Sequence, residues 1–274
     1  KDPLLELRFF RSAPFSGANA IAVLAFVVLA GWLFLNTLYL QEVRGYSPLM
    51  AGVAALPATI VIVVVSPLTG RVVGRRGSRA PLAVSGLLLL GGCALLVRVT
   101  PGSPYLYLAG AYLLIGLGFG MVNPPITNTA VSGMPRAQAG VAAAVAGTAR
   151  QVGSVLGVAV LGAVVTSGMR GQLTSRLAGS HLPAPLVTRL RASSAGTGGL
   201  DVAGLPEGAV RVARAAFTAA THTGWAVAAG CGLVVTAVSL LTTKAAPGEH
   251  AGRPPTAGSV EQSADSREGQ RAYR

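Results

Sequence analysis

Six long apolar stretches, separated by short polar connections, set the pattern of this chain. A run of about twenty apolar residues is long enough, as an α-helix, to cross a hydrocarbon core of about 30 Å. The β-branched run at 60–65 could pass for a strand, but the lengths of the flanking segments favour a membrane helix. The pattern therefore predicts an all-α integral membrane protein with spans at about 17–40, 48–69, 82–97, 105–132, 141–166 and 215–241.

Three segments lie outside this pattern. Residues 1–16 mix charged and apolar residues and are suited to the membrane surface. We expect residues 168–214, rich in Gly, Ser, Pro and Arg, to form a long extracytoplasmic loop, and the polar tail at 244–274 to be disordered. The chain begins at Lys1 without a signal-peptide pattern, so we expect it to be part of something longer.

The composition agrees with a membrane protein, since 51% of the 274 residues are hydrophobic and only 11% are charged. A net charge of +13 could indicate a nucleic-acid partner, but the basic residues punctuate apolar runs instead of clustering on a polar face. We therefore expect no nucleic-acid partner. Cys93 and Cys231 fall within apolar stretches and are predicted to be inert thiols.

The distribution of basic residues predicts the orientation. Arg71, Arg75, Arg76 and Arg79 fall in one tight connection, which marks it as cytoplasmic, whereas the short loops on the other side hold only Arg44 and Arg98. The arginines of the 168–214 loop argue the other way. We predict a multi-pass protein of the cell membrane with both termini cytoplasmic.

The fifth span carries polar residues where they are costly. Arg150 at mid-span costs about 2.5–3.5 kcal/mol on insertion scales, so Arg150 and Gln151 are predicted to face a cavity; the alternative is an arginine that snorkels to the interface. Gly153 and Gly157 form a small-residue stripe for helix packing, and Ser154 lies near Arg150 on the same side.

The fourth span contains two adjacent prolines, Pro124 and Pro125, which remove backbone donors. We expect them to bend or unwind the helix near Asn123, Thr127 and Asn128. Unwound backbone at membrane depth is tolerated mainly where it lines a cavity, so these three side chains are candidate cavity residues.

A polar cluster closes the first span, and Asn36 and Tyr39 are its candidate substrate contacts. An interfacial aromatic belt explains Tyr39 equally well. His222, near the start of the sixth span, could be titratable, but a hydrogen-bonded interfacial histidine is the commoner outcome.

All nine acidic residues lie outside the spans or at their edges. A proton-coupled pump normally needs an intramembrane carboxylate or histidine, so we expect coupling residues to lie elsewhere. No paired acids, metal set or nucleophile with its base occurs at usable spacing, which argues against a membrane-embedded enzyme. No catalytic residue, metal or cofactor is predicted.

Two stretches carry a family resemblance. The segment LYLQEVRGYSPLMAG at 38–52, followed by Leu56 and Pro57, resembles the start of the C-terminal half of fourteen-span drug/proton antiporters of the major facilitator superfamily. PRAQAG at 135–140 and ARQVGSVLGVA at 149–159 resemble the penultimate helix of the same subgroup. The resemblance implies the last six spans of an exporter. Charged loops after the second and fourth spans fit two inverted three-helix repeats.

The connection after the second span is similar to the superfamily's cytoplasmic signature G-x-x-x-D-R-x-G-R-R. Gly74 stands where the acidic residue is expected, which puts the family's charge relay in doubt; the alternative is a plain positive-inside loop. The implied gating loop comprises Gly70, Arg71, Arg75, Arg76, Gly77 and Arg79.

The resemblance implies a transporter half, residues 17–243, that exports amphipathic drugs or antibiotics by alternating access. The proton motive force would drive it through the missing N-terminal half, and its partners would be that half, membrane lipid and a small amphipathic substrate. The alternatives are a non-transporting remnant or scaffold, or a transporter of another small metabolite.

Overall fold

The computed structural model describes residues 13–131, 139–178, 183, 186–188, 190 and 205–242, all within one compact unit that covers residues 1–244. The lead-in before residue 13 and the tail at 244–274 lie outside the described residues. The longer elements are helices α1 (Ala13–Leu38), η2 (Tyr39–Val43), α2 (Pro48–Ala54), α3 (Leu56–Arg76), α4 (Arg79–Leu96), α5 (Tyr105–Val131), α6 (Ala139–Ala178) and α8 (Glu207–Thr242).

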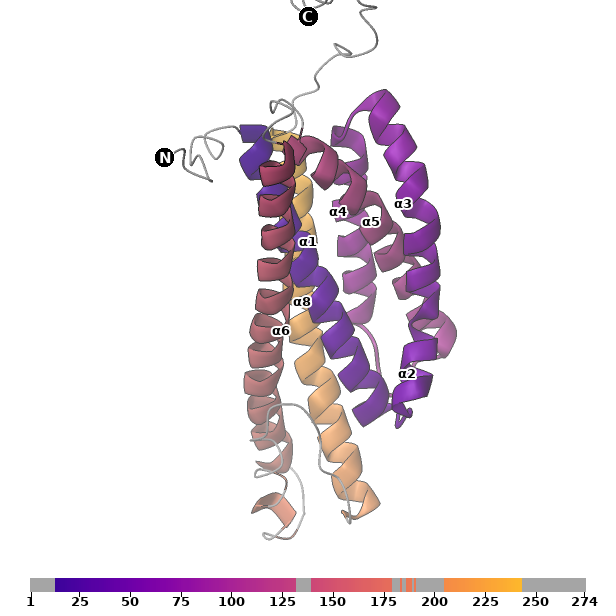
Figure 1. The fold of residues 1–274 in the computed structure, drawn as a ribbon. Coiled ribbons are helices and arrows are strands. Elements are labelled where there is room, and N and C mark those ends of the chain that lie inside the picture. The colour runs from indigo at the N-terminus through magenta and orange to yellow at the C-terminus, as the bar shows by residue number, and fades with distance from the viewer. Residues whose placement is uncertain are drawn as a thin grey trace, which may run out of the picture. The chain divides into compact units, whose positions relative to one another are not determined.

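The described part of the chain is helical and contains no strand (Figure 1). Six of its helices are long and apolar enough to cross a membrane. One is α1 together with its π-helical extension η2. The others are α3, α4, α5, α6 and α8. The predicted fold class and number of spans are confirmed.

The second span differs from its predicted bounds of 48–69. Pro57 has no N–H with which to continue the helix of α2, and the Ala55 N–H bonds to the Gly52 carbonyl instead, so the chain breaks at Ala55 and restarts as α3. At its other end α3 continues to Arg76. The predicted connection over residues 70–81 is therefore helical in its first half.

The loop predicted at 168–214 was also wrong at both ends. At about 1.5 Å per residue, the 40 residues of α6 and the 36 of α8 reach about 60 and 54 Å, well beyond a hydrocarbon core of about 30 Å. Residues 168–178 and 207–214 are helical, and α6 and α8 pack against each other, with Leu173, Leu177, Ala209 and Ala213 buried in one cluster. The buried row on α6 has a residue at every fourth position: Leu161, Val165, Met169, Leu173 and Leu177.

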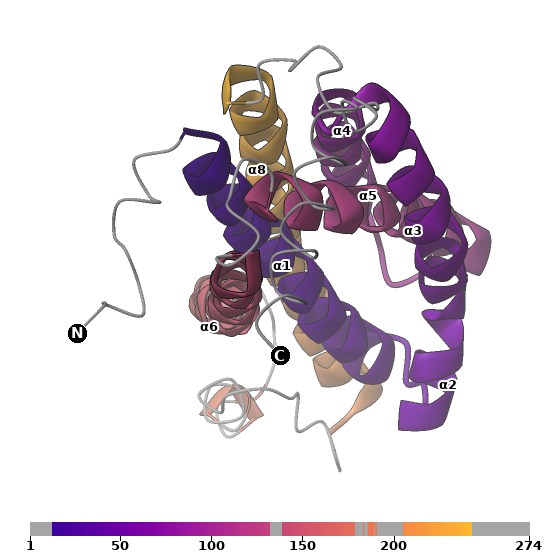
Figure 2. The same cartoon turned by 45° about the horizontal axis from the view of Figure 1, so that its top comes forward.

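The pairing of the helices repeats within the bundle. Helix α1 packs against α6 and α8, and α5 packs in the same way against α3 and α4. Exchanging α1, α3 and α4 for α5, α6 and α8 maps these contacts onto one another, as two three-helix repeats would, although the packing of α6 on α8 has no comparable counterpart between α3 and α4. Figure 2 shows α1 and α5 side by side at the centre of this arrangement.

Glycines allow the helix backbones to approach closely at four interfaces. A Cβ atom on Gly157 of α6 would lie 2.5 Å from the Val27 carbonyl oxygen of α1, closer than real Cβ atoms come to any atom. In lipid, where apolar surfaces gain little by associating, such close packing holds helices together. Equivalent contacts join α3 to α5 at Gly116, α4 to α5 at Gly118, and α4 to α8 at Gly86 and Gly232.

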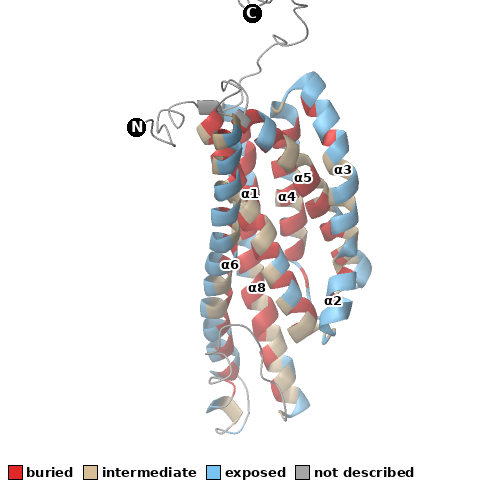
Figure 3. Ribbon diagram, viewed as in Figure 1, coloured by how far each residue is buried: buried red, intermediate tan, exposed pale blue. Residues whose placement is uncertain are grey.

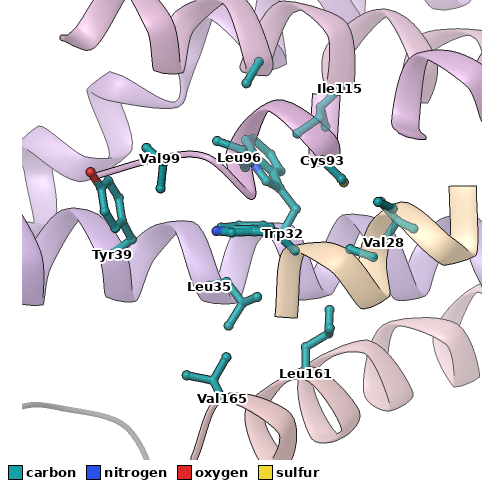
Figure 4. Packing of buried hydrophobic residues seen from close by; sticks show 14 of the residues in the cluster. Val28, Trp32, Leu35, Tyr39, Cys93, Leu96, Val99, Ile115, Leu161 and Val165 are labelled. Atoms are coloured by element: carbon teal, nitrogen blue, oxygen red, sulfur yellow. The ribbon is translucent and has the colours of Figure 1, made fainter. Parts of the chain in front are cut away.

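The core between α1, α4, α5, α6 and α8 is aromatic and aliphatic (Figure 4). Trp32 and Tyr112 pack edge to face, with ring centroids 5.5 Å apart. Cys93 is fully buried in this cluster, as expected for an inert packing thiol.

Burial is uneven among the spans (Figure 3). Only 17% of the apolar stretch of α3 and 28% of that of α6 are buried inside the chain, against 44–56% in the other four. Helices α3 and α6 therefore present most of their surface to whatever surrounds the described bundle.

We expect Gly157→Ala to lower the free energy of unfolding by about 1–3 kcal/mol, because the new methyl group meets backbone atoms that cannot move aside. Thermal unfolding of the purified protein in detergent would measure the change. The matched control is Gly147→Ala on the same helix, where a Cβ meets nothing within 4 Å. Equal stability of the two variants would contradict the close packing of α1 and α6.

Candidate functional site

Arg150 is the centre of the candidate site. Its Nη2 donates a hydrogen bond of 2.5 Å to Oγ1 of Thr127, and this bond joins α6 to α5. The Thr127 hydroxyl in turn donates to the Asn123 carbonyl at 3.4 Å. The structure thus joins Arg150 to two residues, Asn123 and Thr127, that the sequence analysis selected on another helix.

The guanidinium of Arg150 is incompletely satisfied. Its Nε atom is buried and has no hydrogen-bond partner among the described residues. Arg150 lies about 16 Å along α6 from Ala139, at about 1.5 Å per residue, which places it well inside the span. A buried guanidinium N–H without a partner is costly, so this group is suited to donate a hydrogen bond to an oxygen of a ligand.

The other polar residues near Arg150 lie on the outer part of the bundle. Gln151 is exposed, and Ser154, one turn further along α6, is half-buried. Asn128 is exposed and its Nδ2 donates to Oγ of Ser78 at 3.4 Å, which ties the end of α5 to the connection between α3 and α4. Their role as cavity residues stays a prediction.

Gly153 and Gly157 follow Arg150 on α6 and lie against α1. A Cβ on Gly153 would come within 2.3 Å of the Val23 carbonyl oxygen. The position of Arg150 is therefore set by two backbone contacts within the next two turns of its own helix.

The proline pair does not unwind α5, which runs without interruption from Tyr105 to Val131. Pro124 cannot donate to the carbonyl of Gly120, but Oγ of Ser66 on α3 donates to it at 3.3 Å. The sequence analysis missed Ser66. Its only signal was a hydroxyl within an otherwise apolar stretch, immediately before Pro67.

Asn36 and Tyr39 lie apart from Arg150, and their polar atoms are used inside the bundle. Tyr112 donates its hydroxyl hydrogen to Oδ1 of Asn36, which joins α5 to α1. The Tyr39 hydroxyl donates to the Thr100 carbonyl at 2.7 Å, in the connection between α4 and α5. Both side chains are buried, with 3% and 2% exposed. Their contact with a substrate stays a prediction.

The opposite ends of the bundle can be told apart by their contacts. Thr100 lies at the same end as Val99, whose carbonyl is 2.6 Å from Nε2 of His222. His222 is thus hydrogen-bonded, and its place at a membrane interface stays a prediction. We call this the Thr100 end, and the end that carries Arg75 and Arg76 the arginine end.

The predicted gating loop lies at the arginine end. Gly70, Arg71 and the last turn of α3, with Arg75 and Arg76, are helical and exposed. Cations in a last turn interact favourably with the helix dipole. Gly77 has a φ of 80° and its N–H bonds to the Val73 carbonyl at 3.0 Å, which ends the helix as glycine can.

Arg79 connects this loop to another helix. Its Nη2 donates to the Leu240 carbonyl at 3.1 Å, near the end of α8. Gly74, at the position of the expected acid, faces open space. The only acidic residues in the described part of the chain are Glu42 and Glu207, and neither is in this loop. The described residues therefore supply no acid for a charge relay here.

Comparison with known proteins identifies related chains. The model of the Major Facilitator Superfamily matches residues 1–158. A tetracenomycin C resistance and export protein of Streptomyces glaucescens is 34% identical over 91% of this chain and 48% of its own length. The multidrug resistance protein Stp of Mycobacterium tuberculosis is 35% identical over 64% of the chain. A puromycin resistance protein of Streptomyces alboniger is 37% identical over 63%.

The chain spans about half the length of the tetracenomycin relative, and its matches to the Stp and puromycin relatives cover 33% and 35% of theirs. The names of all three relatives contain the word resistance, and one of these names also contains the word export.

We expect Ser66→Ala to destabilise the packing of α3 on α5 by about 0.6–1.5 kcal/mol, because the Gly120 carbonyl then loses its donor. Ser167→Ala is the control, since that hydroxyl is exposed and bonds only to the Val164 carbonyl of its own helix. Denaturation of the detergent-solubilised protein would compare the two. An effect of Ser66→Ala no larger than the control would show that Gly120 does not depend on α3.

Proposed function

Because the chain belongs to the Major Facilitator Superfamily, we propose that it forms half of a membrane exporter of amphipathic drugs or antibiotics. The observation that carries this proposal is its 34% identity, over 91% of its length, to an antibiotic resistance and export protein. That match covers 48% of the relative, which supports an active transporter made of this six-span unit and a second one.

The burial of the helices supports the same division. Helices α3 and α6 are the least buried spans, and α6 carries an arginine that is costly against lipid. In the proposal, the second half covers these surfaces and encloses a central cavity, with Arg150, Gln151 and Thr127 on its wall. Alternating access then exposes this cavity to one side of the membrane at a time.

We further propose that proton coupling depends on the second half. The two described acids cannot carry protons past Arg150: Glu42 lies in η2 at the Thr100 end, and Glu207 begins α8 beyond His222. An intramembrane carboxylate is the usual proton carrier, so the second half would supply it. The arginine end would face the cytoplasm, as cationic connections do.

The test is drug resistance in an efflux-deficient bacterium that expresses this chain together with its second half. We expect resistance to at least one antibiotic, with drug accumulation restored by a protonophore. Expression of this chain alone is the matched control and should give no proton-driven efflux.

Two results would contradict the proposal separately. Absence of any drug efflux from the whole, membrane-inserted protein would favour the scaffold or another substrate. Efflux that persists with a protonophore, or that this chain supports alone, would refute coupling through the second half.

A further inference from the structure

The hydrogen bonds around Arg150 leave part of its donor set unused. An arginine has five N–H donors in a planar fork. The structure pairs Nη2 with Thr127, while Nε is buried and has no partner among the described residues. The Thr127 hydroxyl accepts from Nη2 alone and donates its hydrogen to the Asn123 carbonyl, so it does not pair with Nε.

No carboxylate in the described part of the chain pairs with the Arg150 guanidinium. Thr127 lies near the C-terminal end of α5, which is the end farther from Thr100. Glu42 lies in η2, close to Tyr39, whose hydroxyl bonds to the Thr100 carbonyl. Glu207 is farther out still, because α8 reaches the Thr100 end only at His222. Arg150 is thus an intramembrane cation without a carboxylate from the described residues.

The surroundings of Arg150 are suited to a bound molecule. Gln151 and Thr127 are exposed on the described bundle, and both are neutral. The positive charge of Arg150 would repel a permanently cationic molecule at this place, because little water lies between them to screen the two charges. A molecule with two neighbouring oxygen acceptors would instead match the fork.

We propose that Arg150 selects cargo that carries paired oxygen acceptors, such as a carboxylate or an enolate, over permanently cationic cargo. The proposal rests on the export function proposed above and names the chemical class of its substrates. Thr127 holds the guanidinium in place from α5, and the contact of Gly153 with Val23 fixes the helix that carries it.

The same oxygen chemistry could come from a carboxylate of the second half. In that case Arg150 would hold the two halves together and its removal would affect every cargo alike. Cargo recognition predicts instead a change in the preference between cargoes, so the two sources of oxygen can be distinguished.

The test compares two dyes that share a xanthene scaffold: fluorescein, which bears carboxylate and phenolate oxygens, and rhodamine 123, a cation. Efflux of each is measured from cells that express the whole transporter at matched membrane levels. We expect the wild type to prefer fluorescein. Arg150→Gln should lower the fluorescein-to-rhodamine ratio about tenfold or more, and Arg150→Lys, which keeps the charge but loses the fork, should restore part of it.

Arg98→Gln is the matched control, since it removes an exposed arginine beyond the end of α4 and should leave the ratio unchanged. Equal loss of both dyes in Arg150→Gln, or no change in the ratio, would overturn the proposal, as would a wild type that prefers rhodamine or exports neither dye. If the wild type still exports an antibiotic in that last case, the proposed function stands without this inference; if it exports no drug, both fall.

Discussion

The close approach of helix backbones at glycines is the constraint on which the bundle depends. Lipid tails are as apolar as the side chains, so helices in a membrane gain little from burying apolar surface and rely on tight packing. At Gly157, Gly116 and Gly118 the neighbouring backbone occupies the space that any other side chain would need. These contacts fix α1 against α6 and α5 against its two neighbours. The outer surfaces of α3 and α6 are left largely uncovered by the other described helices.

Several polar side chains inside the bundle bond to a partner on another helix or connection. Asn36 accepts from Tyr112, Ser66 donates to the carbonyl freed by Pro124, and His222 bonds to Val99. These bonds join neighbouring parts of the bundle to one another. Arg150 Nε is one of five buried side-chain atoms without a partner among the described residues; the others belong to Asn19, Trp32, Arg214 and Trp225. The proposed function centres on Arg150 because its charge lies within the apolar part of a span and bonds to another helix.

The number of spans and the family followed from local sequence, since twenty apolar residues and a few motif residues suffice to identify them. The ends of α6 and α8 did not. In the part of α6 beyond residue 168, only Met169, Leu173 and Leu177 are buried, and the exposed residues between them include Arg170 and Arg176. Such an amphipathic pattern resembles a loop to a hydropathy analysis, and its helical state depends on α8.

The residues of the candidate site were also predicted only in part. The energetic cost of a charge in the membrane selected Arg150, and the prolines directed attention to Thr127, but the bond between them depends on how α5 and α6 pack. Of the bend or unwinding expected at the proline pair, unwinding does not occur, and Ser66, on another helix, supplies a donor to the carbonyl that Pro124 leaves free. Asn36 and Tyr39 were selected for their polarity, and only the fold shows that their polar atoms have internal partners.

The central claim is that the side of the bundle near Arg150 faces a water-filled cavity and not lipid. The most direct measurement is labelling of Gln151→Cys in the whole transporter, with Cys93 and Cys231 replaced by alanine, by a charged, membrane-impermeant thiol reagent applied to the purified, reconstituted protein. The comparison is Val234→Cys, at an exposed position of α8 within its apolar span. The account predicts that Gln151→Cys reacts, that bound drug protects it, and that Val234→Cys does not react. Equal resistance of both positions to the charged reagent would show that Arg150 lies against lipid, and would contradict the account.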